Sequence, residues 1–411
     1  MRDTELYSRI LGIEAPWTVD DVVVDLGAGK VEVHLAELSG PLPCPECGAS
    51  CPGYDRMVRR WRHLDTCQLQ TILVAEVPRV RCEQHGVKQI RVPWGEPGSK
   101  FTAMMEALII DWLLEAPIEA VRRRLGLSWS AVDTIRRRAI ARGLERREQA
   151  LPTQLAVDET SFQKRHEYVT VVLDSSGKKA RVLHVADGRS TEALGDFLAG
   201  FCPEQLAALD TVTMDMWAPY AKAVREHVPD ADSKIAYDRF HVAQHLGFAV
   251  DQVRRQQQRV CAGDASELKG LRWLLLRRAA NLFEEQLARV EALKYSAPKI
   301  ARAWALKEAF ASIWQAQTGE DARRLWRRWH AWAIRSRLEP IKKVARMIQR
   351  HLAGILNAVG KRVSNARAES FNSLIQKIKR QACGFRNRER FRLAIYFHLG
   401  GLDLYPSGIS R

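Results

Sequence analysis

The sequence predicts a multidomain protein of the α+β class. Apolar and polar residues alternate with the period of a strand near the N-terminus and again after residue 150, whereas residues 242–358 show helical patterns and no strand signals. A chain of 411 residues is also longer than one hydrophobic core organises. We therefore expect five segments, which are residues 1–98, 99–150, 151–245, 246–358 and 359–411.

The composition indicates a polyanionic partner. The formal net charge is +16 and the pI is about 9.7, and such a field attracts nucleic acid, with an anionic membrane surface as the competing partner. The nearest candidate for a membrane span, residues 101–114, is interrupted by Glu106 and Asp111. The N-terminus is acidic where a signal peptide is apolar. We expect a cytoplasmic protein that reaches chromosomal DNA and has no membrane partner.

Two short pairs of cysteine and histidine residues lie in the first segment. They are Cys44 with Cys47 and Cys82 with His85. Two intervening residues let one tight turn present both ligands to the same ion, and four nitrogen and sulfur ligands close a tetrahedral structural zinc site. A hairpin is expected at residues 20–40, with its turn at residues 27–29, and a strand at residues 68–80 would bring the second pair back beside the first. Residues 1–98 are therefore predicted to form a zinc-binding module.

Other interpretations of this module stay open. The two pairs could be unrelated, because the gap between them is longer than in small zinc fingers. Cys51 or Cys67 could replace one ligand, and His63 is expected at the surface. A zinc ion would keep the module folded and would not take part in a reaction, because no ligand position is left for water.

Residues 99–150 have the pattern of a helix-turn-helix. Three helices are expected, over residues 101–114, 118–125 and 131–139. Gly126 lies in the turn, and Ser128 is placed to cap the last helix. The apolar positions at which the last two helices should pack are Val121, Leu125, Leu127, Val132 and Ile135.

The outward side chains of this segment are predicted to contact DNA. Arginine triplets suit phosphate oxygens, and the first side chains of a recognition helix reach into a groove. The candidates are Arg122, Arg123, Arg124, Trp129, Ser130, Thr134, Arg136, Arg137 and Arg138. An ordinary helical hairpin with a solvated basic face is the competing interpretation.

Three apolar strands in the next segment each end in an aspartate. They are residues 155–157 before Asp158, 211–214 before Asp215 and 234–237 before Asp238. Further strands are expected over residues 168–173 and 180–185, and a helix over 191–199. Because neighbouring strand ends converge in an α/β layer, Asp158 and Asp215 are expected to share divalent cations, which prefer oxygen ligands. Alternatively, each aspartate caps its own strand or turn.

A helix is predicted over residues 365–380. Asn365, Glu369 and Asn372 are three or four residues apart and therefore share one face of it. The basic residues of this helix that are expected to contact DNA are Arg367, Lys377 and Lys379. A solvated helix face with one ordinary glutamate is the competing interpretation.

A mostly helical insertion is predicted between these two carboxylate regions. Its residues, 242–358, are rich in Leu, Ala, Arg and Gln and poor in Gly and Pro. Helices are expected over residues 271–287, 298–315 and 322–334. Tryptophans recur here, and they either pack a core or stack on unpaired bases.

These residues lie in motifs that resemble one family. The motifs are AVDET at Asp158, VTMDMW at Asp215, YDRFH from Tyr237 to His241, NARAESFNSLIQ around Glu369 and GFRNRERF from Gly384. With the cysteine pairs and the helix-turn-helix, they resemble the DDE transposases of bacterial insertion sequences, and the ISL-three (ISL3) family in particular. The resemblance extends from about residue 40 to residue 400. It implies an RNase H-like catalytic domain interrupted by the insertion, two Mg²⁺ (or Mn²⁺) ions per site, and transposon-end and target DNA as substrates.

The resemblance also implies roles for individual residues. Asp158 would bridge the two ions, Asp215 would hold one and Glu369 the other, so that water or a DNA 3′-hydroxyl is activated and the leaving oxygen is stabilised. The supporting residues would be Asp238, His241, Asn365 and Asn372. If one ligand is misassigned, we expect Asp215 and Asp238 to exchange.

Three other functions stay open at this point. A zinc and helix-turn-helix transcription regulator explains residues 40–148 but not the Glu369 motif. A two-metal junction nuclease would cleave DNA without transferring strands, and an inactive transposase would keep the motifs without the reaction. For a transposase we expect a nucleoid-associated bacterial protein that forms a homodimer on paired ends.

Overall fold

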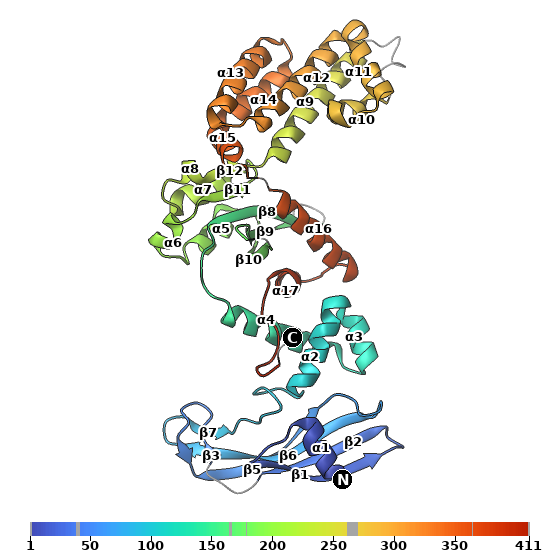
Figure 1. Cartoon of the computed structure of the whole chain (residues 1–411), viewed down its shortest axis with the longest axis vertical. Helices are drawn as coiled ribbons and strands as arrows, with labels where there is room; N and C mark the ends of the chain where they lie inside the picture. The colour runs from blue at the N-terminus through green and yellow to red at the C-terminus, as the bar shows by residue number, and fades with distance from the viewer. Residues whose placement is uncertain are drawn as a thin grey trace. The chain divides into compact units, whose positions relative to one another are not determined.

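The computed structural model describes residues 2–37, 42–163, 167–177, 179–260, 270–363 and 365–409. The chain forms two compact units, one of residues 1–147 with 402–411 and one of residues 148–401 (Figure 1). Within the described residues, no helix combines the length and the apolar character that crossing a membrane requires.

A five-stranded sheet forms the core of the first unit. Its order is β1-β2-β6-β5, and β7 also pairs with β6. The strands are β1 (Trp17–Asp25), β2 (Lys30–Glu37), β5 (Gly53–Arg62), β6 (Gln70–Cys82) and β7 (Gly86–Gln89). The predicted hairpin is present as β1 and β2, and Gly29 at its turn has a φ of 65°, which favours glycine. Residues 38–40 of the predicted range lie outside the described residues. Trp94 packs edge-on against both Trp17 and Trp61 in the core.

Smaller elements surround this sheet. Helix α1 (Asp3–Leu11) precedes it, and β3 (Leu42–Pro43) pairs with β4 (Ser50–Cys51) beside the first cysteine pair.

The predicted helix-turn-helix is present in the same unit. Its helices are α2 (Ala103–Glu115), α3 (Ile118–Leu125) and α4 (Trp129–Arg146). Gly126 is left-handed, and the Ser128 hydroxyl accepts a hydrogen bond from the Ala131 N–H at 3.2 Å. Val121, Val132 and Ile135 are buried as predicted. Helix α4 extends beyond the predicted end at residue 139. Residues 402–405 pack on this unit, where Leu402 closely approaches Gly143 and Tyr405 donates a hydrogen bond to Asp111. The predicted segment of residues 359–411 is thus divided between the two units.

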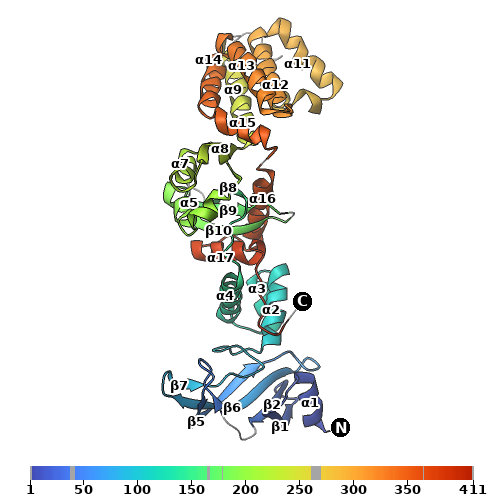
Figure 2. The ribbon, with the colours of Figure 1, turned by 60° about the vertical axis from the view of Figure 1, so that its left-hand side comes forward.

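The second unit is built on a mixed five-stranded sheet in the order β10-β9-β8-β11-β12. Figure 1 labels all five strands, and Figure 2 shows β8, β9 and β10 from another side. The strands are β8 (Gln154–Gln163), β9 (Glu167–Asp174), β10 (Arg181–Asp187), β11 (Thr211–Met214) and β12 (Ile235–Tyr237). The first three are antiparallel, and β11 pairs in parallel with both β8 and β12. Strand β8 does not end at Asp158 as predicted, because β9 continues to pair with it up to Gln163.

Helices cover both faces of this sheet. One face packs on α5 (Thr191–Leu198) and α7 (Ala218–His227), with the short helices α6 (Pro203–Ala207) and α8 (Ala231–Lys234) beside them. The other face packs on α16 (Ala366–Gln381) and α17 (Arg388–Leu399), through Ala156, Ala368, Ile375 and Phe391. Residues far apart in the sequence therefore meet on one strand, β8.

The insertion is helical, as predicted. Its helices are α9 (Arg239–Val260), α10 (Leu271–Leu276), α11 (Glu284–Ser296), α12 (Pro298–Ala311), α13 (Gly319–Arg335), α14 (Glu339–Arg350) and α15 (Leu352–Gly360). The prediction of a single helix over residues 271–287 is wrong. The backbone adopts an extended conformation at Arg277, and the short 3-10 helix η1 (Ala279–Asn281) separates α10 from α11. A second 3-10 helix, η2 (Ser312–Gln315), continues α12. Trp326 and Trp329 are core residues, whereas Trp273 is 64% exposed.

A buried side-chain hydrogen bond links the end of β5 to the helix-turn-helix in the first unit. His63, which we expected at the surface, is buried, and its Nδ1 lies 2.9 Å from the hydroxyl of Thr102, the residue that caps α2. Burial, assisted by the nearby Arg62 guanidinium, lowers the pKa of His63 to about 4. The imidazole is therefore neutral in the folded protein at neutral pH.

Acidification is expected to destabilise the first unit through His63. The unfolded chain has a histidine pKa near 6.5 and binds more protons than the folded chain at any pH between that value and about 4. The free energy of unfolding should therefore fall as the pH drops through this window, by about 3 kcal/mol in total. Thermal unfolding measured by circular dichroism across the window gives this dependence.

The variant His63→Asn keeps a polar side chain near Thr102 and removes the titrating group. It should lose this contribution to the pH dependence, whereas His34→Asn, at a half-buried histidine of the same unit, should keep it. Parallel pH curves for wild type and His63→Asn would show that His63 does not control the transition.

Candidate active site and metal centre

The first unit contains a cluster of four metal-ligand side chains. The ligand atoms of Cys44, Cys47, Cys82 and His85 all lie within 4.8 Å of one another. The sulfur atoms of Cys47 and Cys82 are 3.7 Å apart, and His85 Nδ1 lies 3.5 Å from Cys82 Sγ. A tetrahedral ion with Zn–S bonds of 2.3 Å separates two sulfur ligands by about 3.8 Å. The four side chains therefore fit a zinc ion.

Each of the two turns favours the thiolate form of its first cysteine. Backbone N–H groups of His85 and Gln84 lower the pKa of Cys82 to about 7, and the backbone N–H of Cys47 lowers the pKa of Cys44. The pKa of Cys47 is raised instead, by burial and by the neighbouring thiols of Cys44 and Cys82. The alternative ligands lie outside the cluster. The thiol of Cys51 donates a hydrogen bond to the carbonyl of Ala49, and Cys67 is exposed.

The parallel strands of the second unit bring three aspartates to one edge. Thr213 of β11 pairs with Ala156 of β8, and Met214 pairs with Tyr237 of β12. The residues that follow these pairs by one or two positions are Asp158, Asp215 and Asp238. The Asp238 N–H also donates a hydrogen bond to the Met214 carbonyl at 2.9 Å. Asp158 thus lies beside the point where β11 ends, although β8 itself continues.

Helix α16 is bound to this edge by two asparagines. The Asn372 amide donates to Asp158 Oδ2 at 2.7 Å and to the Glu159 carbonyl at 3.2 Å. Asn365, which is buried, accepts a hydrogen bond from the Thr213 hydroxyl at 3.3 Å. Glu369 lies between these two residues on the helix and is exposed. The three carboxylates predicted as a triad are therefore carried by β8, by the residue after β11 and by α16.

Burial, with a smaller contribution from neighbouring charges, disfavours ionisation of the carboxylates at this edge. Burial, together with the charges of Asp215 and Glu159, raises the pKa of Asp158 to about 7, while His241 opposes the shift. Burial and the charge of Asp238 likewise raise the pKa of Asp215, and the same two causes raise the pKa of Glu369. Carboxylates in such a row retain protons or bind cations.

Asp238 belongs to the same row. Its side chain is 4% exposed, and among the described residues Oδ2 has no hydrogen-bond partner. His241, predicted to support the site, has its Nε2 4.0 Å from that oxygen. The three carboxylates of the triad do not all lie within 4.8 Å of one another, since in the described part of the chain only the cysteine cluster meets this condition. The geometry is that of a row and not of a single-ion cage.

Sequence reasoning missed a cation at this site. Arg189 Nη1 lies 3.2 Å from Glu159 Oε1, and the guanidinium stacks over the rings of Tyr168 and Trp217. Its charge also lowers the pKa of Asp215, against the effect of burial. In the sequence, Arg189 is marked only by its position before Ser190, which caps α5. That position predicts the start of a helix and does not connect Arg189 with the carboxylates.

A cavity opens beside Glu369 and Asp238. Its volume is about 310 Å³, and it reaches from these carboxylates to the insertion. Aromatic and cationic side chains line it, among them Arg239, Phe240, Lys307 and Trp314. Lys307 is held by the carbonyls of Leu275 and Arg277 at the end of α10, so its ammonium is a fixed charge in the wall.

The candidate DNA contacts of the helix-turn-helix have different environments. Ser130, Thr134 and Arg123 are exposed, as a DNA contact requires. Arg136 is not available for this role, because its side chain is buried and its Nη2 lies 2.5 Å from Asp133 Oδ1. Sequence spacing placed Arg136 outward, but it misjudged how closely α4 packs.

The remaining arginines of the two triplets also have protein partners. Arg138 lies 3.4 Å from Glu96, and Arg137 lies 3.1 Å from Asp133. Arg122 pairs with Glu119 at 2.7 Å, and Arg124 stacks over Trp112. Trp129, the first residue of α4, is half-buried.

On α16, only Lys377 of the predicted DNA contacts is exposed without a described partner. Arg367 donates to the Ser175 carbonyl, and Lys379 donates to the Ser161 carbonyl at 2.9 Å. The last two side chains therefore help to hold α16 on the sheet.

A row of carboxylates in one unit, in a chain whose other unit carries a helix-turn-helix and a zinc-binding module, is typical of metal-dependent enzymes that act on DNA strands. Residues 155–395 match a transposase family model of the ISL3 type, residues 41–85 match the zinc-finger of the IS204, IS1001, IS1096 and IS1165 transposases, and residues 90–140 match the helix-turn-helix domain of transposase family ISL3. The first match covers more than half of the chain. The chain belongs to the ISL3 family of DDE transposases, which bind DNA.

Curated relatives agree with this assignment over most of their length. The transposase for insertion sequence element IS1001 from Bordetella parapertussis is 29% identical over 371 residues, which are 89% of this chain and 90% of the relative. The transposase for insertion sequence element IS1557 from Mycobacterium tuberculosis is also 29% identical, over 94% of this chain and 93% of the relative.

Replacing one ligand of the cysteine cluster should release zinc. The purified chain is expected to contain about one zinc ion, and Cys82→Ser should lose it because three ligands with a hydroxyl no longer close the site. Elemental analysis measures the zinc, and proteolysis tests whether residues 1–98 stay folded. Cys67→Ser is the matched control and should keep both zinc and folding. Zinc retained by Cys82→Ser would exclude this ligand set.

Proposed function

We propose that this transposase cleaves and transfers transposon-end DNA with Asp158, Asp215 and Glu369 as ligands of two Mg²⁺ or Mn²⁺ ions. The observation that carries the proposal is the 2.7 Å hydrogen bond from Asn372 to Asp158, because it fixes the helix of Glu369 beside the strand ends. The raised pKa values of the carboxylates support cation binding, since a divalent ion would replace the retained protons. When bound, the ions would activate the attacking oxygen and stabilise the leaving oxygen.

The chain's own residues position this site. Asn372 and Asn365 hold α16 without adding charge, so the carboxylates keep their affinity for cations. Arg189 neutralises Glu159 on the strand that carries Asp158. The strand order of the sheet, with three antiparallel strands followed by two parallel ones, supports an RNase H-like fold, and the helices between β12 and α16 support an insertion into it.

The cavity beside Glu369 is the place where aromatic side chains of the insertion would stack on unpaired DNA bases. Phe240 is 52% exposed at its wall, and Trp314 also lines it, whereas Trp326 and Trp329 are core residues. An aromatic wall next to the cleaved bond would stack an unpaired base of the opened end. The substrates would be two transposon ends and a target duplex, which a homodimer would hold together.

Removing the bridging carboxylate is expected to abolish the reaction. Asp158→Ala should reduce Mg²⁺-dependent cleavage of labelled transposon ends to background and leave the affinity for the ends unchanged, because the DNA-binding elements lie elsewhere. Asp196→Ala, at an exposed aspartate of α5, is the matched control and should cleave normally. Cleavage by Asp158→Ala would contradict the assignment of Asp158 as a metal ligand. A strand-transfer assay with a target plasmid separates a transposase from a nuclease that only cleaves.

A second pair of variants decides between Asp215 and Asp238. The unsatisfied Oδ2 of buried Asp238 favours a cation near this residue, whereas Asp215 already accepts a hydrogen bond from the Trp217 N–H at 3.0 Å. If Asp215 is the ligand, Asp215→Asn should weaken Mn²⁺ binding measured by calorimetry by about tenfold or more, and Asp238→Asn should change it less. The reverse order would assign the ligand to Asp238.

A further inference from the structure

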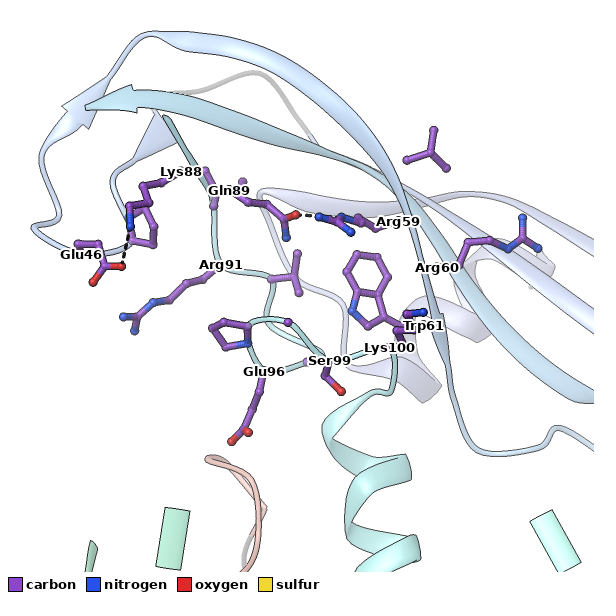
Figure 3. A pocket seen from close by; sticks show the side chains of 17 residues that line it. Glu46, Arg59, Arg60, Trp61, Lys88, Gln89, Arg91, Glu96, Ser99 and Lys100 are labelled. Atoms are coloured by element: carbon purple, nitrogen blue, oxygen red, sulfur yellow. Dashed lines mark hydrogen bonds and ion pairs between the residues drawn. The ribbon is translucent and has the colours of Figure 1, made fainter. Parts of the chain in front are cut away.

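A groove in the zinc-binding module has no part in the site described so far. Its volume is about 580 Å³, and Figure 3 shows its lining. One wall is β5, another is β7 with the residues that follow it, and the turn at Pro45 and Glu46 between the first two zinc ligands closes one end. Buried Trp61 lies at its floor, where Val58 and Ile90 add apolar surface.

Positive charge predominates in this groove. Its cations are Arg59, Arg60, Lys88, Arg91 and Lys100, and its carboxylates are Glu46 and Glu96. Two of the cations are paired, Lys88 with Glu46 at 3.5 Å and Arg60 with Glu32 outside the groove. Glu96 is bound by Arg138 and Arg142 of α4, which do not line the groove, so it does not neutralise the groove's own cations.

Three cations therefore have no carboxylate partner among the described residues. Arg59 donates to the neutral amide of Gln89 at 3.0 Å, and Arg91 and Lys100 are exposed. In Figure 3, Arg91 lies between Lys88 and Glu96. Unpaired cations along a concave surface with an apolar floor match the alternating phosphates and sugars of a nucleic-acid backbone.

The groove is structurally continuous with the helix-turn-helix. The Lys100 carbonyl accepts a hydrogen bond from the Arg62 N–H at 2.9 Å, and the Ala103 N–H at the start of α2 donates to the Trp94 carbonyl at 2.8 Å. Glu96, on the rim, is anchored by two arginines of α4. The segment that lines the groove thus also starts the helix-turn-helix, within one compact unit.

We propose that this groove binds the sugar–phosphate backbone of duplex DNA through Arg59, Arg91 and Lys100. The zinc-binding module then contacts DNA directly, and the zinc ion acts indirectly by holding the turn of Pro45 and Glu46 in the wall. The inference rests on duplex DNA being the substrate of the proposed function. It gives the module a role beyond the structural one that its closed ligand set indicates.

The test compares two triple variants of the full chain. One carries Arg59→Ala, Arg91→Ala and Lys100→Ala. The other carries Arg2→Ala, Arg9→Ala and Lys30→Ala, which remove the same charge from exposed positions of the same module that do not line the groove. Binding to a fluorescent mixed-sequence duplex is measured by anisotropy over a range of salt concentrations, and zinc content and thermal unfolding check that both variants are folded.

The groove variant is expected to bind on the order of tenfold or more weakly at moderate salt. The slope of log K against log salt should decrease in magnitude by about 2 to 3, as three lost phosphate contacts require. The control variant should keep the wild-type slope. Equal changes in both variants would show a general charge effect, and an unchanged slope in the groove variant would show that the groove binds something else; either result overturns the proposal.

Single variants cover the case in which the triple variant loses zinc or unfolds. Arg91→Gln changes one exposed side chain and should reduce the slope by about 0.9, and an unchanged slope would contradict the proposal. The proposed function fails in a different way. If the wild-type chain bound no duplex, the DNA substrate itself would be in doubt, whereas normal end cleavage by a groove variant with unchanged binding would overturn only the role of the groove.

Discussion

The burial of neighbouring carboxylates at one edge of a sheet is the constraint on which the second unit depends. The parallel pairing of β11 with β8 and β12 puts Asp158, Asp215 and Asp238 in a row, and α16 adds Glu369. Each carboxylate in this arrangement makes ionisation of its neighbour less favourable. A divalent cation bound here would relieve this electrostatic cost, and the packing around the carboxylates keeps them from moving apart.

The groups that hold this arrangement are mostly neutral. Asn372 and Asn365 attach α16 to β8 and β11, and Gln376 continues the contact by donating to the Thr160 hydroxyl at 3.0 Å. A lysine or arginine in place of Asn372 would bind Asp158 more strongly but would also compete with a metal ion for it. The charged residues lie farther from Asp158 along these elements. Lys379 lies near the end of α16, and Glu159, which pairs with Arg189, follows Asp158 on β8.

The sequence allowed the local elements to be predicted better than their ends and environments. Zinc-ligand spacing, the Gly126 and Ser128 turn, and the strand before Asp158 all depend on neighbouring residues, and the structure contains each of them. The end of β8 depends on its pairing with β9, and the break at Arg277 depends on tertiary packing, so neither could be predicted from periodicity. Arg189 enters the site from a loop that no spacing rule connects to Asp158.

The distribution of positive charge shows how far composition alone can lead. The net charge of +16 predicted a DNA-binding protein, but several of the arginines that looked most suitable are structural. Arg136 pairs with buried Asp133 within α4 itself. Arg138 and Arg142 both pair with Glu96 and so join α4 to the segment before α2, and Arg142 also pairs with buried Glu106 of α2. Cations available for phosphates must therefore be found by asking which ones lack a carboxylate partner. In the zinc-binding module, this criterion selects exposed cations such as Arg91 and Lys100. The sequence pattern of this module indicated only a structural metal site.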